Sequence, residues 1–74
     1  MNLDQFQKSL TESESALLIG IGMAIFSAVE AGAPQRTLVD RLQVHEDNFE
    51  KLGQTKASQM MTMLKMMAQS TARR

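Results

Sequence analysis

The chain contains no cysteine, no tryptophan and no tyrosine, and it has a single histidine among its 74 residues. Without cysteine, disulfide bonds and thiolate metal ligands are excluded. The histidine, His45, is followed directly by Glu46 and Asp47, and consecutive positions do not match the ligand spacing of a metal site. One histidine gives no basis for a Ser–His–Asp set, and no GK[ST] motif follows the "GIG" at 20–22. The sequence therefore predicts a non-enzymatic protein with no catalytic residue, no metal site and no cofactor.

Acidic and basic residues are equal in number but unevenly distributed. Residues 1–34 hold four acids and one lysine, residues 35–50 hold four acids and two arginines, and residues 51–74 hold five basic residues and no acid. We favour attraction between the acidic and basic segments, within one fold or across a dimer. Alternatively, the basic segment binds an acidic partner. Nucleic acid stays open as that partner, although a neutral chain lacks the usual basic excess.

A long apolar run, "ALLIGIGMAIFSAV", occupies residues 16–29. It has the length of a signal-peptide core, but Glu12 and Glu14 precede it where a signal peptide carries positive charge. Its fourteen residues are short for a membrane span. We therefore expect a buried helix, no membrane span and a cytoplasmic protein.

Local signals predict a first long helix over residues 12–31. A capping box is formed either by Thr11 with Glu14 or by Ser9 with Glu12. Gly32 stands where a left-handed C-cap belongs, and a proline follows two residues later. The preceding residues, 1–10, are expected to form a short helix or an arm that packs on a neighbour.

Two further helices are predicted after Pro34. Pro34 suits the first position of a short helix of about ten residues, which ends near residues 44–45. Asp47 as a cap, with an acid three residues later, predicts a third helix over 48–70, and residues 70–74 form a frayed tail. The whole chain, 1–74, is therefore one all-α domain of three helices (long, short, long), hairpin-like and dimeric.

The first helix is apolar nearly all the way round, and two short helices cannot cover such a surface in a monomer. Gly20 and Gly22 each cost the helix roughly 1 kcal/mol relative to alanine. Close packing of a second helix over the strip of small residues Gly20, Ala24 and Ser27 would offset that cost; a kink or hinge at the glycines is the alternative. The residues expected at a dimer interface are Leu17, Gly20, Ile21, Ala24, Ile25 and Ala28.

Methionines are concentrated in "QMMTMLKMMAQ", residues 59–69. Core filling is the default explanation, because most of these residues share one face of the third helix. Methionine also adapts to several surfaces, and Met61 and Met66 widen the apolar arc beyond one neighbour. The segment is therefore expected to contribute both to the core and to a partner-binding surface, whose candidate residues are Lys56, Met60, Met61, Met63, Lys65, Met66 and Met67.

The order of these features resembles the small bacterial AriR/YmgB-type connector proteins of biofilm formation and acid resistance. The points of similarity are "LTESESALL", an apolar helix ending at Gly32, "RTLVDRL", and a last helix from "EDNFEKL" through "MMTMLKMM". Methionines replace the leucines and isoleucines of that family's last helix. The resemblance implies a helical homodimer in signalling or transcriptional regulation, which binds a regulatory protein; it leaves DNA binding open. It assigns no functional residue here.

The favoured interpretation is a bacterial regulatory or adaptor protein that acts through protein–protein contact as a helical homodimer. One alternative is a secretion-type chaperone or a small assembly subunit. A second alternative is a small DNA-associated transcriptional regulator.

Overall fold

The computed structural model describes residues 3–71, with side chains from residue 5 onward. It contains helices α1 (Leu3–Ser9), α2 (Glu12–Glu30), α3 (Gln35–Lys51) and α4 (Thr55–Ser70), and no strand in this part of the chain. The prediction of an all-α fold is confirmed, but the described residues form four helices rather than three. The expected tail lies mostly outside the described residues, because Ser70 ends α4 and 72–74 are not described.

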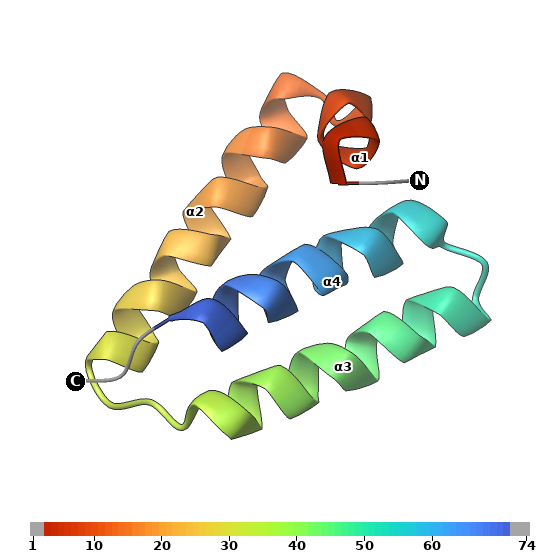
Figure 1. Ribbon diagram of the computed structural model, residues 1–74. Coiled ribbons are helices and arrows are strands. Elements are labelled where there is room, and N and C mark those ends of the chain that lie inside the picture. Colours follow the sequence, from red (N-terminus) through yellow and green to blue (C-terminus); the bar gives the residue numbers. More distant parts are fainter. Residues whose placement is uncertain (1–2, 72–74) are drawn as a thin grey trace.

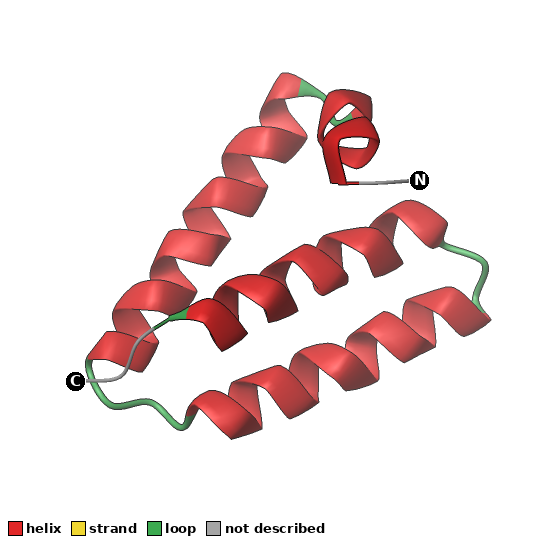
Figure 2. Ribbon diagram, in the orientation of Figure 1, coloured by secondary structure: helices red, strands yellow, loops and turns green. Residues whose placement is uncertain are grey.

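The helices pack around α4, which contacts both α2 and α3 (Figure 1). Short connections join the helices, as the green segments of Figure 2 show. The short helix α1 lies near the N-terminal ends of α2 and α4 (Figure 1) and places Phe6 in the core. Of the two alternatives predicted for the start of the chain, a short helix or an arm, residues 3–9 form the short helix.

Local signals set the two ends of α2. The backbone N–H of Glu14 donates to Thr11 Oγ1 at 3.1 Å, and the Thr11 N–H donates to Glu14 Oε1 at 2.8 Å. This is the first of the two capping boxes considered, since the Ser9 hydroxyl donates to the Phe6 carbonyl instead. After the helix, Gly32 has φ of +107°, a conformation that glycine adopts without steric cost.

The boundary between α3 and α4 differs from the prediction. Instead of ending near residues 44–45, α3 continues through Asp47 to Lys51, and α4 begins only at Thr55. The turn is at Gly53, where φ is +72° and the backbone N–H donates to the Glu50 carbonyl at 3.0 Å. Asp47 caps no helix and accepts a hydrogen bond from the Gln43 side chain at 2.9 Å. Pro34 likewise precedes α3 as its N-cap, rather than being its first residue.

The core is small and is built around one residue from each of three helices. Phe6 of α1, Leu18 of α2 and Leu64 of α4 are buried together. Further apolar side chains surround them and are partly buried: Leu10, Ile25, Leu42, Met60, Met61, Met63 and Met67. Because α4 contributes most of these side chains, it is the central helix of the fold.

A glutamine side chain of α3 caps the end of α4. Gln35 Nε2 donates to the Ala68 carbonyl at 2.6 Å and to the Gln69 and Thr71 carbonyls at 3.1 Å each. The last carbonyls of a helix have no partner within the helix, so these contacts satisfy groups that the helix itself leaves free. They also connect the start of α3 to the end of α4.

We expect Gln35→Leu to lower the free energy of unfolding by about 1 kcal/mol, because the hydrogen bonds to these carbonyls are lost. Gln35→Glu should cost about 1 kcal/mol more, since it places negative charge at the negative end of the helix dipole. Urea denaturation followed by circular dichroism measures both changes. Gln69→Leu alters an exposed glutamine of α4 and should have little effect. Equal stability of Gln35→Leu and the wild type would show that water replaces this cap at no cost.

Candidate interaction surface

The most unusual surface of the molecule is the outside of α2. Within this helix, whose side chains are all described, Leu18, Gly22 and Val29 are buried. The large apolar side chains Leu17, Ile19, Ile21 and Met23 are 62%, 59%, 47% and 55% exposed. No charged residue lies between Glu14 and Glu30. Water therefore contacts an apolar surface along most of the helix, a property that marks interaction sites in soluble proteins.

Five of the six residues expected at a dimer interface lie on this exposed side. At 100° per residue they span an arc of about 100° on the helix. They form what we call the α2 face: Leu17, Gly20, Ile21, Ala24 and Ala28. The sixth, Ile25, is turned inward, where it packs against the core cluster. The α2 face is therefore a continuous strip of small and aliphatic side chains that nothing in the described chain covers.

The two glycines of α2 have different surroundings. A Cβ atom at Gly22 would lie 2.3 Å from Met67 Sδ, so the missing side chain lets the α4 methionine approach the α2 backbone. A Cβ atom at Gly20 would meet no atom of residues 5–71 within 4 Å. Close packing inside the chain thus occurs at Gly22, and the strip containing Gly20 is open. The helix continues through both glycines without a break.

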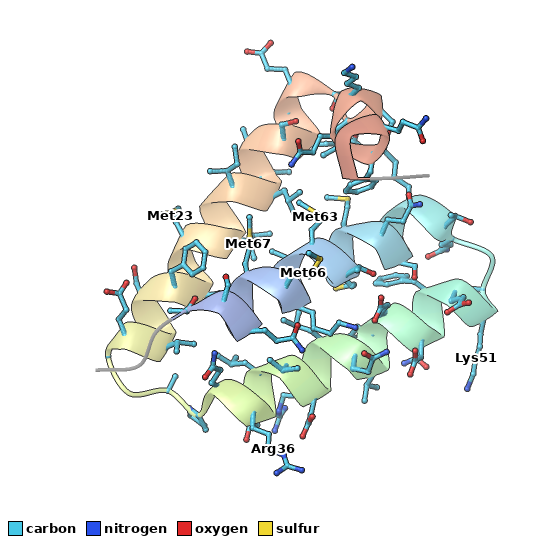
Figure 3. The ribbon with its side chains drawn as sticks, viewed as in Figure 1. Met23, Arg36, Lys51, Met63, Met66 and Met67 are labelled. Atoms are coloured by element: carbon cyan, nitrogen blue, oxygen red, sulfur yellow. The ribbon has the colours of Figure 1, made fainter. Side chains whose placement is uncertain are left out.

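The methionines of α4 mostly contribute to the core. Met60, Met61, Met63 and Met67 are partly buried and pack against the core cluster, and Met63 and Met67 lie between α4 and α2 (Figure 3). Met61, expected to extend an interface, therefore takes part in the core. Met66 is 43% exposed and remains accessible to a partner.

The two lysines considered for partner binding form ion pairs within the chain. Lys56 Nζ lies 2.8 Å from Glu14 Oε1 and also donates to the Ser9 carbonyl at 3.3 Å. Lys65 Nζ lies 2.8 Å from Glu46 Oε2. Basic residues of the last segment thus pair with acids of the first two segments within one chain. The sequence analysis considered such attraction either within one fold or across a dimer.

The pair between α3 and α4 is the more enclosed of the two. The side chains of Lys65 and Glu46 are 17% and 14% exposed. Lys65 also donates to Gln43 Oε1 at 2.5 Å, and the Thr62 hydroxyl donates to Glu46. Hydrogen bonds from Lys65 and then Thr62 hold the pKa of Glu46 below its usual value, against the opposing effect of burial. The pKa of Glu14 is also lowered, first by its hydrogen bond with Lys56 and then by that with the Thr11 backbone.

The lowered pKa of Glu46 predicts a loss of stability in acid. A carboxylate with a lower pKa in the folded state stabilises the fold fully above its unfolded-state pKa, near 4.5. That contribution declines as the pH falls below this value and is lost once the pH passes the folded-state pKa. Glu46→Gln should lower the free energy of unfolding at neutral pH by about 1–3 kcal/mol. It should also reduce the change in stability across the acid range, as urea denaturation at a series of pH values would measure.

The control for this experiment is Glu50→Gln, one turn further along α3 at an exposed position. Because this side chain is exposed, the substitution should leave the stability at neutral pH close to that of the wild type. If Glu46→Gln retains the full acid dependence of the wild type, the pair with Lys65 does not exist in solution as described.

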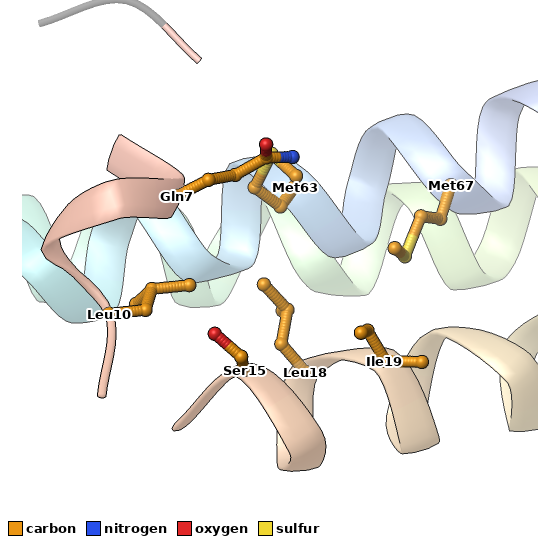
Figure 4. Close-up of a pocket in the computed structure, with 7 residues that line it drawn as sticks. All are labelled: Gln7, Leu10, Ser15, Leu18, Ile19, Met63 and Met67. Atoms are coloured by element: carbon orange, nitrogen blue, oxygen red, sulfur yellow. The ribbon is translucent and has the colours of Figure 1, made fainter. Parts of the chain in front are cut away.

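A pocket of about 300 Å³ lies where α1, α2 and α4 meet (Figure 4). Its lining consists of Gln7, Leu10, Ser15, Leu18, Ile19, Met63 and Met67. Leu18 points from α2 toward α4, and Met67 points from α4 toward α2 (Figure 4). The sequence analysis did not predict this pocket, because the pocket depends on the position of α1. The spacing of the apolar residues in 1–10 allowed either a short helix or an arm, so that position could not be predicted.

Two other kinds of site can be compared with the described residues: a metal site and a membrane span. Within residues 5–71, no group of three or more histidine and acidic side chains is placed to hold a metal ion. By length and composition alone, α2 could cross a membrane. An 18-residue window of this helix has a mean hydropathy of 1.4, and 17% of the window is buried in the fold. The apolar surface of α2 is therefore the feature that a function must explain.

No protein family model, no curated protein and no solved structure matches this chain.

Proposed function

We propose that this chain is a small non-enzymatic interaction protein that forms a homodimer through the α2 face and acts as a regulatory adaptor for another protein. The observation that carries the proposal is the exposure of a charge-free apolar helix along one side of a 74-residue domain. The proposal does not depend on the resemblance to AriR/YmgB-type connector proteins, which stays a prediction.

The composition of the α2 face supports self-association. Burying a leucine or isoleucine side chain fully contributes about 1.5–3 kcal/mol, and Leu17 and Ile21 are both substantially exposed. Gly20, Ala24 and Ala28 lie between or beside them and would let a second helix approach closely. In a two-fold dimer each favourable contact occurs twice, so one apolar strip supplies both halves of the interface.

A protein partner fits α2 better than a lipid bilayer does. The charge-free segment from Ser15 to Val29 is about 22 Å long as a helix, shorter than the ~30 Å hydrocarbon core. Both ends of the helix carry acids, and the chain lacks the tryptophan and tyrosine that are enriched at membrane interfaces. A second copy of the helix requires neither the extra length nor those anchors.

The ion pairs of Lys56 and Lys65 weigh against the DNA-binding alternative. Both lysines are matched by acids within the fold, which reduces the positive charge that α4 offers to phosphates. An adaptor that acts on protein surfaces needs no such excess of positive charge.

The two glycines of α2 give the test of this proposal. Gly20→Ala should stabilise the isolated fold by about 0.5–1 kcal/mol, because alanine favours the helix and the new methyl group meets none of the described residues. At a close helix–helix contact the same methyl group costs about 1–3 kcal/mol. Sedimentation equilibrium should therefore show a dimer dissociation constant raised about tenfold or more.

Gly22→Ala is the matched control, because its methyl group meets Met67 inside the chain rather than a second copy. It should change the stability of the fold and leave the dimer dissociation constant unchanged. A Gly20→Ala variant that gains stability while self-association stays as in the wild type would place the interface elsewhere. Binding of the wild-type chain to lipid vesicles, without dimerisation in water, would favour a membrane role instead.

A further inference from the structure

The pocket between α1, α2 and α4 has a lining suited to one class of small molecule. We propose that it binds an uncharged aliphatic chain with a single polar head group, as in a straight-chain alcohol. The volume of about 300 Å³ lies at the small end of the range for ligand pockets. The inference goes beyond dimerisation and does not require it.

The chemistry of the lining selects this ligand class. Five of the seven lining residues are apolar, and none carries a charge. A charged ligand would lose its hydration without gaining an opposite charge, which is strongly unfavourable. None of these seven described residues is aromatic, so the lining favours aliphatic over aromatic ligands.

Two polar side chains fix the expected orientation. Gln7 of α1 and Ser15 near the start of α2 border the pocket (Figure 4), and their side chains have no hydrogen-bond partner among the described residues. Ile19 and Met67 border it one helical turn further along α2 and α4 from Ser15 and Met63. We expect the head group to lie beside Gln7 and Ser15, with the chain directed toward Ile19 and Met67.

The methionines make the site adaptable. Met63 and Met67 are unbranched and can adjust to chains of different length. Met67 lies directly over Gly22, where the missing side chain gives the thioether room against the α2 backbone. The depth of the pocket at this end therefore depends on the position of a single flexible side chain.

The pocket and the α2 face lie on different sides of α2. Ile19, which lines the pocket, is about 160° around the helix from Leu17. A second copy packed on Leu17, Gly20 and Ala24 therefore leaves the opening of the pocket accessible. Ligand binding and dimerisation can be measured separately on the same protein.

The test is titration of the full chain, labelled with 13C in the methionine methyl groups, with straight-chain alcohols of increasing length. Saturable shifts are expected at Met63 and Met67, and not at the exposed Met23 and Met66. Affinity should rise about fourfold for each added methylene until the chain fills the pocket. The carboxylate of the same length should bind about tenfold more weakly or worse, since no positive side chain lines the site.

Ile19→Trp should fill the pocket and weaken alcohol binding at least tenfold, whereas Met23→Trp, a similar change four residues along α2 and outside the lining, should not. Ser15→Leu gives a second blocking variant if circular dichroism shows that Ile19→Trp does not fold.

The proposal is overturned if the shifts are non-saturable or equal at all methionines, or if folded blocking variants bind as the wild type does. It is also overturned if Ile19→Trp changes the dimer dissociation constant and not alcohol binding, because the pocket would then belong to the self-association surface.

Discussion

Replacing Leu64 with alanine is expected to lower the free energy of unfolding by about 2–5 kcal/mol, the cost of a buried leucine truncated in a core. Leu64 is 3% exposed and contacts the buried Phe6 and Leu18, so it joins α4 to α1 and α2. A chain of this length has a total stability of about 4–11 kcal/mol. The substitution should therefore remove a large share of it and lower the melting temperature by at least about 10 °C.

Met66→Ala is the matched control, two residues further along the same helix at a side chain that is 43% exposed. It should change stability by no more than about 0.5 kcal/mol. Both variants should be compared at one protein concentration, because a dimer is stabilised by mass action. If Met66→Ala destabilises the protein as much as Leu64→Ala does, α4 presents a different face to the core than described.

Replacing Ala24 with glutamate is expected to abolish dimerisation while preserving the fold. Ala24 is exposed at the centre of the α2 face, and glutamate is a good helix former, so the isolated chain should tolerate the change. In a two-fold interface the substitution buries two unpaired negative charges, each with a cost of about 3–5 kcal/mol. The dissociation constant should rise by at least about a thousandfold, as sedimentation equilibrium can measure.

Val44→Glu provides the control for Ala24→Glu. Val44 is an exposed apolar residue of α3, at 55% exposure, and the change in charge is the same. It should leave the dimer intact, because the outside of α3 is not part of the proposed interface. Dissociation by both substitutions alike would indicate that added negative charge, rather than the α2 face, controls self-association.

The sequence predicted the features that depend on a few neighbouring residues. The left-handed Gly32 was predicted, and the capping box of Thr11 and Glu14 was one of the two predicted alternatives, because each requires groups only a few residues away. The same local rules gave a wrong prediction at Asp47. This residue is followed by an acid three residues later, a pattern typical of a helix N-terminus, but it lies inside α3. There α3 continues instead to Lys51, with the half-buried Leu42 and Phe49 on one side of the helix, and Gly53 supplies the actual break.

The side of α2 that faces the core could not be predicted from neighbouring residues. This helix carries apolar side chains around almost its whole circumference, so the periodicity of the sequence does not indicate which side faces inward. Leu18, Gly22 and Val29 are the buried residues of α2, and the approach of Met67 of α4 to Gly22 joins residues 45 positions apart. The pairs of Lys56 with Glu14 and of Lys65 with Glu46 also join different helices. Charge distribution indicated attraction between segments but could not name the partners.

The most direct test is the mass of the pure wild-type chain, measured by sedimentation equilibrium over a series of concentrations. Burial of the α2 face against a second copy predicts a species of twice 8.2 kDa, the mass of one chain, that persists at micromolar concentration. A well-folded species of 8.2 kDa at every concentration, up to the millimolar range, would contradict the account, because water would then cover the apolar side of α2 at no cost to solubility or folding.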